Sequence, residues 1–146
     1  MKPIFISYSS QHRDLTRALA GVIEAQYGAG SVWWDQELES RASYSEQIRA
    51  ALEKARVVVV LWTAGAMISD YVYAEAVRAQ AQGKLVNVRP ADMRFSDIPE
   101  PFNIHHIDDA EDHAGILATI AQVMAGVPIA TRVPLHEIYS ASTASA

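Results

Sequence analysis

A glutamate, Glu75, follows a run of aliphatic residues at Val57–Leu61. That run has no polar alternation, which predicts a parallel strand covered on both faces. After it the period changes, and apolar residues at helical spacing predict a helix that Ser69 or Asp70 can cap. Glu75 would lie about one and a half turns into this helix. Because ligands of open α/β sheets bind at the carboxyl ends of the strands, this carboxylate is the first candidate for chemistry.

The residues that a disulfide, a metal site or a serine or cysteine nucleophile would require are absent or wrongly spaced. The chain has no cysteine, which excludes disulfides, thiolate metal sites and cysteine nucleophiles. His105 and His106 are adjacent on an expected strand, where they would point to opposite faces, and no third ligand follows at metal spacing. Ser9 and Ser10 have no general base close in sequence. We therefore expect neither a metal site nor a serine nucleophile, and the net charge of −5 without a basic stripe argues against a nucleic-acid surface.

Strands and helices alternate along the chain. Besides Val57–Leu61, short apolar runs predict strands at 4–6, 32–34, 85–88 and 103–107, the last at an edge. Helices fall between them, with Ser43 and Glu46 as a capping box for the second. This alternation predicts an α/β, flavodoxin-like three-layer fold, with a five-stranded parallel sheet in the order 2-1-3-4-5 and helices on both faces. The crevice would lie between strands one and three, lined by residues 8–10 and 63–65. No glycine follows the first strand, so the dinucleotide-binding fingerprint is missing.

The organisation is that of one domain followed by a tail. Half of the 146 residues are hydrophobic, which is enough for one core. From Pro128 onward the sequence is small and polar without a hydrophobic period, so we expect a domain over 1–127 and a linker or flexible tail over 128–146. No apolar stretch approaches membrane-spanning length and no cleavage signal is present, so we expect a soluble, cytoplasmic protein.

From about Pro3 to Val127 the chain resembles a TIR domain of the bacterial kind. The matching stretches are IFISYSS, VWWDQEL, the polar loop after it, VVVVLW and SDYVYAE. In TIR domains that cleave NAD⁺, the last of these carries a serine, an aromatic residue and then a glutamate. Ser69, Tyr71 and Glu75 hold these positions here, with tyrosine where the family more often has tryptophan. The loop at 39–42 departs from the proline and glycine turn of many relatives.

The resemblance implies an activity and a site. The activity is that of an NAD⁺ glycohydrolase or cyclase in bacterial immunity or effector action, with Glu75 as the catalytic residue. The substrate-binding residues that it implies are Tyr8, Ser9, Asp35, Glu39, Tyr44 and Tyr71. It implies no metal and no cofactor, with NAD⁺ as the substrate. The expected partners are other TIR domains, in a homo-oligomer or filament, and a fused or associated sensor domain, with no nucleic acid and no membrane. The expected compartment is the bacterial cytoplasm, or a host cell if the protein is a secreted effector.

One carboxylate suffices for this reaction. Ordinary glycosidases need a second carboxyl group to protonate a poor leaving group. Nicotinamide, however, leaves a pyridinium as a neutral molecule. Glu75 could hold the ribose hydroxyls and stabilise the oxocarbenium character that develops, while Tyr71 could stack on the nicotinamide ring. The products would be nicotinamide with ADP-ribose or a cyclised ADP-ribose.

Two other interpretations stay open. Glu75 and Arg78 are three positions apart, so they can form a plain surface ion pair on the helix. The domain can also be a TIR interaction module without turnover, which has no need of Glu75. A receiver-like signalling domain shares the fold but is disfavoured. It needs an acidic pair after the first strand, where the chain has SYSS, and an aspartate after the third, where it has TAG.

Overall fold

The computed structural model describes residues 2–8, 13–34, 41–67 and 70–131, and only the backbone of residues 41–45, 47, 67, 70 and 71. In this part of the chain, five strands form one parallel sheet in the order β2-β1-β3-β4-β5, which confirms the predicted fold class. The strands are β1 (Ile4–Ser7), β2 (Val32–Trp33), β3 (Val57–Leu61), β4 (Leu85–Arg89) and β5 (Ile107–Asp109). The helices are α1 (Arg13–Tyr27), α2 (Arg41–Lys54), α3 (Ala64–Met67), α4 (Asp70–Ala81) and α5 (His113–Met124), with 3₁₀ turns η2 (Phe95–Asp97) and η3 (Phe102–Ile104).

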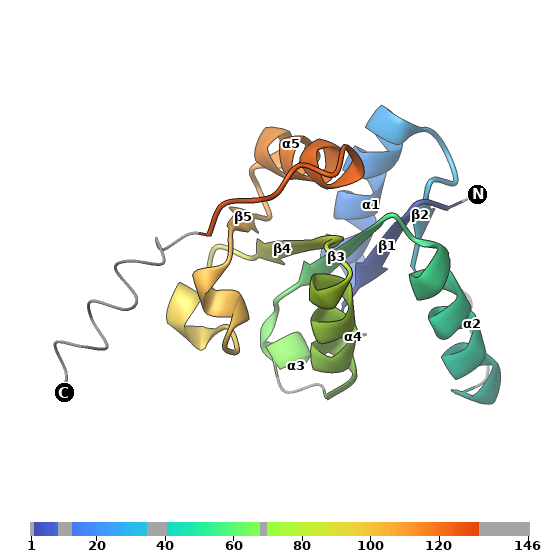
Figure 1. Ribbon diagram of the computed structural model, residues 1–146, viewed down its shortest axis with the longest axis horizontal. Coiled ribbons are helices and arrows are strands. Elements are labelled where there is room, and N and C mark those ends of the chain that lie inside the picture. Colours follow the sequence, from blue (N-terminus) through green and yellow to red (C-terminus); the bar gives the residue numbers. More distant parts are fainter. Residues whose placement is uncertain (1, 9–12, 35–40, 68–69, 132–146) are drawn as a thin grey trace, which may run out of the picture.

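The sheet lies between two layers of helices (Figure 1). Helices α1 and α5 cover one face, and α2, α3 and α4 cover the other. Strand β3 is central, and all five of its residues are fully buried, as the unbroken aliphatic run predicts. Its side chains alternate between the two hydrophobic cores, with Val57 and Val59 under α1 and α5 and Val58 and Val60 under α2 and α4.

The register of β1 on β3 decides what reaches the end of the sheet. The two strands pair from Ile4 with Val57 to Ser7 with Val60, so Ser7 ends β1 beside the last residues of β3. Side chains of a strand alternate between faces, and Phe5 belongs to the core under α2 and α4. Ser7, two residues further on, therefore projects toward the same helical layer.

Helix α4 forms because its inward positions are apolar and its end carries a glycine. Val72, Ala76 and Ala79 are buried against the sheet. At its end the amide of Gly83 donates to the carbonyl of Gln80, and the amide of Lys84 donates to that of Ala79, both at 3.1 Å. Gly83 has a φ of +69°, a left-handed conformation that glycine adopts without steric cost. The helix thus ends where the sequence predicts.

Two local predictions near the carboxyl edge of the sheet need correction. Helix α2 begins at Arg41, so Ser43 lies inside the helix and does not form the predicted N-terminal capping box. The segment between β3 and α4, where the strand and the helix of the Glu75 motif predict only a short crossing loop, contains the short helix α3. Thr63 helps to start it, because its hydroxyl accepts a hydrogen bond from the amide of Ala66 at 3.4 Å.

The fifth strand lies further along the chain than predicted. Residues 103–107 were expected to be extended, but η3 covers Phe102–Ile104 and β5 begins only at Ile107. Phe102 explains the difference, because its ring is 1% exposed and packs at 5.4 Å from the ring of Trp62 under α4. Burying this ring turns the chain before it can pair with β4. His105 and His106 therefore precede the strand, and their predicted alternation on it is wrong.

The described helices include none that is long and apolar enough to cross a membrane. Helix α5 ends at Met124 and Gly126 follows it with a φ of +73°. Residues 132–146 lie outside the described part of the chain. The predicted boundary between a domain over 1–127 and a tail over 128–146 therefore stays a prediction.

Candidate functional site

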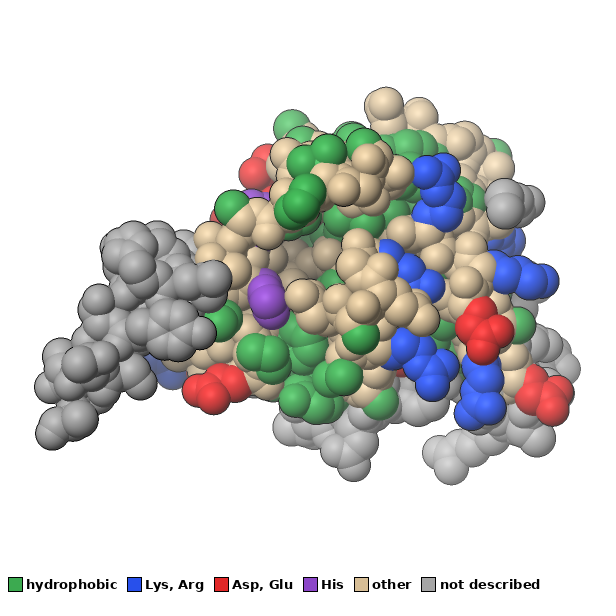
Figure 2. All heavy atoms as spheres, in the orientation of Figure 1, with side chains coloured by type: hydrophobic (Ala, Val, Ile, Leu, Met, Phe, Trp, Pro, Cys, Tyr) green, Lys and Arg blue, Asp and Glu red, His purple; other side chains and the backbone are tan. Residues whose placement is uncertain are grey.

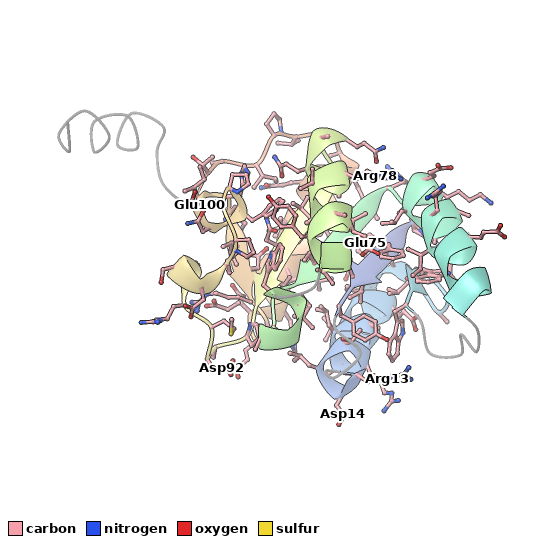
Figure 3. All side chains as sticks on the ribbon, turned by 90° about the horizontal axis from the view of Figure 1, so that it is seen from below. Arg13, Asp14, Glu75, Arg78, Asp92 and Glu100 are labelled. Atoms are coloured by element: carbon pink, nitrogen blue, oxygen red, sulfur yellow. The ribbon has the colours of Figure 1, made fainter. Side chains whose placement is uncertain are left out.

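The carboxylate of Glu75 lies buried between α4 and the end of β1 (Figure 3). The side chain is 7% exposed, and its Oε2 accepts a hydrogen bond from the hydroxyl of Ser7, which is 3% exposed. The two residues are 68 positions apart in the sequence, so this is a tertiary contact that joins the first strand to the fourth helix. A buried carboxylate is costly unless hydrogen-bond donors surround it, and Ser7 is one such donor.

The interpretation of Glu75 as one half of a surface ion pair is wrong. Arg78 is exposed on the outer side of α4, whereas Glu75 is buried. A helix charge that only improves solubility stays in water, so the burial of Glu75 needs a different explanation.

Ser7 and Glu75 meet at the topological switch point of the sheet. From β1 the chain passes to β2 on one side, and β3 lies on the other side of β1. In open α/β sheets, ligands bind outside the carboxyl ends of the strands at this point. Thr63, 1% exposed, follows β3 at the same edge. The predicted position of the crevice, between the first and third strands, therefore contains a buried carboxylate.

Tyr8 lies at the same strand end but packs toward the other helical layer. Its ring is half-buried and meets the ring of Trp34 edge-on, with 5.9 Å between the ring centres. Trp34 belongs to the core under α1 and α5, and the guanidinium of Arg17 lies 6.0 Å from its ring. The structure thus brings Tyr8 to the expected edge, while its contact with substrate stays a prediction.

The remaining predicted site residues fall where the structure gives little or no description. Ser9, Asp35 and Glu39 lie outside the described residues, as does Ser69 of the helix motif. Of Tyr44 in α2 and Tyr71 in α4 only the backbone is described, which places Tyr71 on α4 one turn before Glu75. Their roles in substrate binding stay predictions.

Ser7, the described partner of the candidate catalytic group, was not predicted from the sequence. It belongs to the motif IFISYSS, but the residues after it were the ones expected to line the crevice. The alternation of side chains along β1 was the available signal. Phe5 is large and apolar and must face a helical layer, and Ser7 shares its face, so a small hydroxyl there faces the layer that contains α4.

A hollow lies at the ends of β4 and β5, away from Glu75. It has a volume of about 350 Å³ and is lined by Arg89, Ala91, Asp109, Glu111 and Asp112. The charge of Arg89 is already engaged there, because its guanidinium lies 2.9 Å from Asp109 and 4.1 Å from the ring centre of Phe95. Within the described ranges, no group of three or more acidic or histidine side chains is arranged to hold a metal ion.

Comparison with known proteins identifies the family. Residues 4–120 match the family model of the TIR domain. No curated protein matches the chain. Among solved structures, the fold is similar to that of a metazoan TIR-STING receptor from C. gigas, solved in complex with 2′,3′-cGAMP. The TM-score is 0.63 at 16% identity, over 90% of this chain and 41% of the receptor chain. The chain thus spans about two fifths of that receptor.

A second similar structure is a TIR domain on its own. It belongs to the Toll-related receptor TRR-2 of Hydra magnipapillata, and it matches with a TM-score of 0.65 at 10% identity. The match covers 86% of this chain and 99% of that one. At these identities the structural likeness concerns the fold alone. It agrees with the strand order and the layers described above.

Proposed function

The chain belongs to the TIR-domain family, and from that membership together with the burial of Glu75 we propose that it cleaves NAD⁺ between nicotinamide and ribose. The observation that carries the proposal is the contact of Ser7 with Glu75 at the switch point of the sheet. An interaction module has no need to bury a carboxylate at the ligand-binding edge, since that costs free energy. An enzyme that stabilises a cationic transition state does need one.

The proposed reaction needs one carboxylate from the protein. The bond from C1′ of the ribose to the nicotinamide nitrogen breaks, and its electron pair neutralises the pyridinium ring. Because the leaving group departs without a proton, no general acid is required, in contrast to ordinary glycosidases. Glu75 stabilises the positive charge that develops on the ribose and holds its hydroxyls, an effect that grows where water is excluded. Ser7 fixes the carboxylate by its hydrogen bond.

Either of two nucleophiles completes the reaction. Attack of water on C1′ gives ADP-ribose and releases a proton, whereas attack by another group of the same substrate gives a cyclic ADP-ribose. In both cases NAD⁺ is consumed as a substrate and is not a resident cofactor. Tyr71, one turn before Glu75 on α4, is proposed to stack on the nicotinamide ring. The proposed substrate contacts of Tyr8, Ser9, Asp35, Glu39 and Tyr44 would hold the rest of the dinucleotide.

Measurement of NAD⁺ consumption tests the proposal. The wild-type domain, Glu75→Gln and Arg78→Gln are compared at high protein concentration, with the products separated by chromatography. Glutamine keeps the size of the buried side chain and removes its charge. Arg78→Gln is the matched control, because it removes a charge three residues further on that is exposed to solvent. Turnover should vanish in Glu75→Gln and persist in Arg78→Gln, with circular dichroism showing that both are folded. Turnover that survives in Glu75→Gln would refute the proposal, and a wild-type domain without turnover would favour the interaction module.

We further expect the activity to depend on self-association. If the loop after β2 of one copy packs against the next copy, the contact is head to tail, and such contacts form filaments when they do not close into a ring. Specific activity should then rise with protein concentration. A specific activity that stays constant over a wide range of concentrations would count against assembly.

The proposed setting is bacterial immune signalling, or effector action in a host cell. In either case a fused or associated sensor domain would control assembly. The C. gigas protein offers a parallel, because its name joins TIR to STING and its structure contains 2′,3′-cGAMP. We propose the same kind of arrangement here, with the sensor as a separate partner or a neighbouring domain.

A further inference from the structure

Helix α4 presents an apolar stripe on the side that faces away from the sheet. Tyr73 is 39% exposed and Val77 is 45% exposed, and with Val127 they are the exposed large hydrophobic residues of the described chain. Ala81 continues the row at the same four-residue spacing and Ala74 flanks it, both exposed. We call Tyr73, Val77 and Ala81 the α4 stripe. Figure 2 shows hydrophobic side chains gathered over α4 and the chain beside it.

Tyr73 is held in place at one end of the stripe. Its hydroxyl donates to the carbonyl of Glu100 at 3.3 Å, and its ring meets that of Phe102 edge-on, with 5.7 Å between the ring centres. Because these contacts already fix the ring, it loses little conformational freedom when a partner covers its exposed part. A fixed, half-exposed aromatic ring is a typical anchor of a protein interface.

Two charges of opposite sign flank the α4 stripe. Arg78 follows Val77 in the sequence, and a turn of 100° per residue places it on the flank toward Glu75. Glu100 lies on the other flank, because its carbonyl binds the hydroxyl of Tyr73. Figure 3, which labels both residues, shows them on opposite sides of α4. Arg78 and Glu100 are exposed, and neither forms an ion pair with another described residue.

Arg78 has a charge of the same sign beside it on its own chain. Burial is the main cause that lowers the pKa of Lys84, and the charge of Arg78 lowers it further, while Glu53 opposes the change. Lys84 stays at this place because its Nζ donates to the carbonyls of Leu52 and Ala55. An acidic group of a partner that lies close to Arg78 would offset the repulsion between the two cations. This flank of the stripe therefore favours an anionic partner.

We propose that the α4 stripe is the contact of a two-fold symmetric dimer, with a second copy of the chain as its partner. In such an interface the same patch of each copy faces the other, and every contact occurs twice. A patch with an apolar centre, a basic flank and an acidic flank is complementary to itself. A two-fold axis through the stripe, midway between the two charges, brings Arg78 of each copy to Glu100 of the other. Tyr73 and Val77 then lie between the two ion pairs.

The family of the chain supports a second copy as the partner. Residues 4–120 match the TIR domain, and TIR domains associate with one another. The α4 contact uses a different surface from the head-to-tail contact proposed above, which involves the loop after β2. It does not rest on the proposed cleavage of NAD⁺, because Glu75 is buried on the side of α4 that faces the sheet. Arg78→Gln therefore remains a valid control for turnover.

The size of the stripe predicts a dimer that dissociates on dilution. A single helix face is smaller than the surface of about 800 Å² per partner that a standard stable interface buries. Sedimentation velocity of the whole chain over a range of concentrations measures the dissociation constant. A chain that stays monomeric up to its solubility limit would overturn the proposal.

Val77→Asp tests whether the stripe is the contact. It places a charge in the apolar centre of the dimer, so the dissociation constant should rise at least about tenfold. Val127→Asp is the matched control, because Val127 is 49% exposed and lies beyond the end of α5, outside the stripe. Its dissociation constant should stay within about twofold of the wild type, and circular dichroism checks that both variants are folded. Equal effects of the two substitutions would assign the association to another surface.

A charge reversal tests the symmetry of the contact. Arg78→Glu makes both flanks of the stripe acidic, and Glu100→Arg makes both flanks basic. Each variant alone brings like charges together twice, so its dimer should be at least about ten times weaker than that of the wild type. An equal mixture of the two variants should restore a dimer of about wild-type affinity, because every acidic flank then meets a basic one. A mixture that associates no better than the separate variants would refute the two-fold pairing of Arg78 with Glu100.

Discussion

Replacing Ser7 by alanine removes a described hydrogen-bond donor of Glu75 and leaves its carboxylate in place. Both side chains are more than nine-tenths buried, so water does not readily substitute for the lost hydroxyl. A hydrogen bond to a charged group contributes about 1.5–3 kcal/mol. If the contact holds Glu75 in the geometry of the transition state, kcat should fall by about ten- to a hundredfold, since each 1.36 kcal/mol is a factor of ten. KM should change little, because Ser7 acts through Glu75.

The assay is steady-state consumption of NAD⁺ by Ser7→Ala and Ser7→Thr. Threonine keeps the hydroxyl and favours the strand, so it should restore much of the turnover even if its extra methyl group lowers stability. Thr119→Val serves as the matched control. It removes a buried hydroxyl that donates to the carbonyl of Gly115 at 3.0 Å on α5, on the opposite face of the sheet. That variant should lose stability and keep its turnover.

Two results would refute this reasoning. Turnover of Ser7→Ala within twofold of the wild type would show that the contact does not position the carboxylate. Loss of turnover in both Ser7→Ala and Thr119→Val would assign the effect to general destabilisation. A double-mutant cycle of Ser7→Ala with Glu75→Gln, measured by urea unfolding, tests the contact independently of activity. We expect a coupling free energy of about 0.5–3 kcal/mol.

Three further predictions concern the scaffold. Asn87→Ala should lower the free energy of unfolding by about 1–3 kcal/mol, because it leaves the buried indole N–H of Trp62 without the acceptor it now has at 2.9 Å; denaturant titration measures this. Lys84→Met should cost about 1–2 kcal/mol in the same measurement, because Nζ donates to two carbonyls at the end of α2 at 2.6 and 3.1 Å, and unchanged stability would contradict it. Burial lowers the pKa of His105 below its ordinary value of 6.5, so the unfolded chain binds more protons below that pH and stability falls on acidification. His105→Gln should show a smaller loss of stability than wild type between pH 7.5 and pH 5, and an equal loss would contradict the assignment.

The fold could be predicted from the sequence because its strongest signals are long and periodic. The run Val57–Leu61 is short, aliphatic and largely β-branched, which predicts a strand buried on both faces, and the alternation of strands with amphipathic segments leaves few topologies. The errors occur where a single side chain overrides the local pattern. Phe102 turns the chain into η3 to bury its ring against Trp62, and no period in the sequence announces that contact. The start of a short edge strand such as β5 is hard to predict, because only a few backbone hydrogen bonds to the neighbouring strand oppose a change made by one side chain.

The site was predicted in part, and the missing part was the pairing. The position of Glu75 could be predicted, because the helix that contains it follows a buried strand. The burial of Glu75 could not be predicted from helical spacing, because that spacing puts Glu75 on the same side of the helix as the exposed Arg78. What buries it is the first strand, 68 residues earlier, which ends in a small hydroxyl instead of a large apolar side chain. Spacing within one element cannot express a contact between two elements. The contact can be inferred only from which side chains of β1 face each helical layer, taken together with the order of the strands.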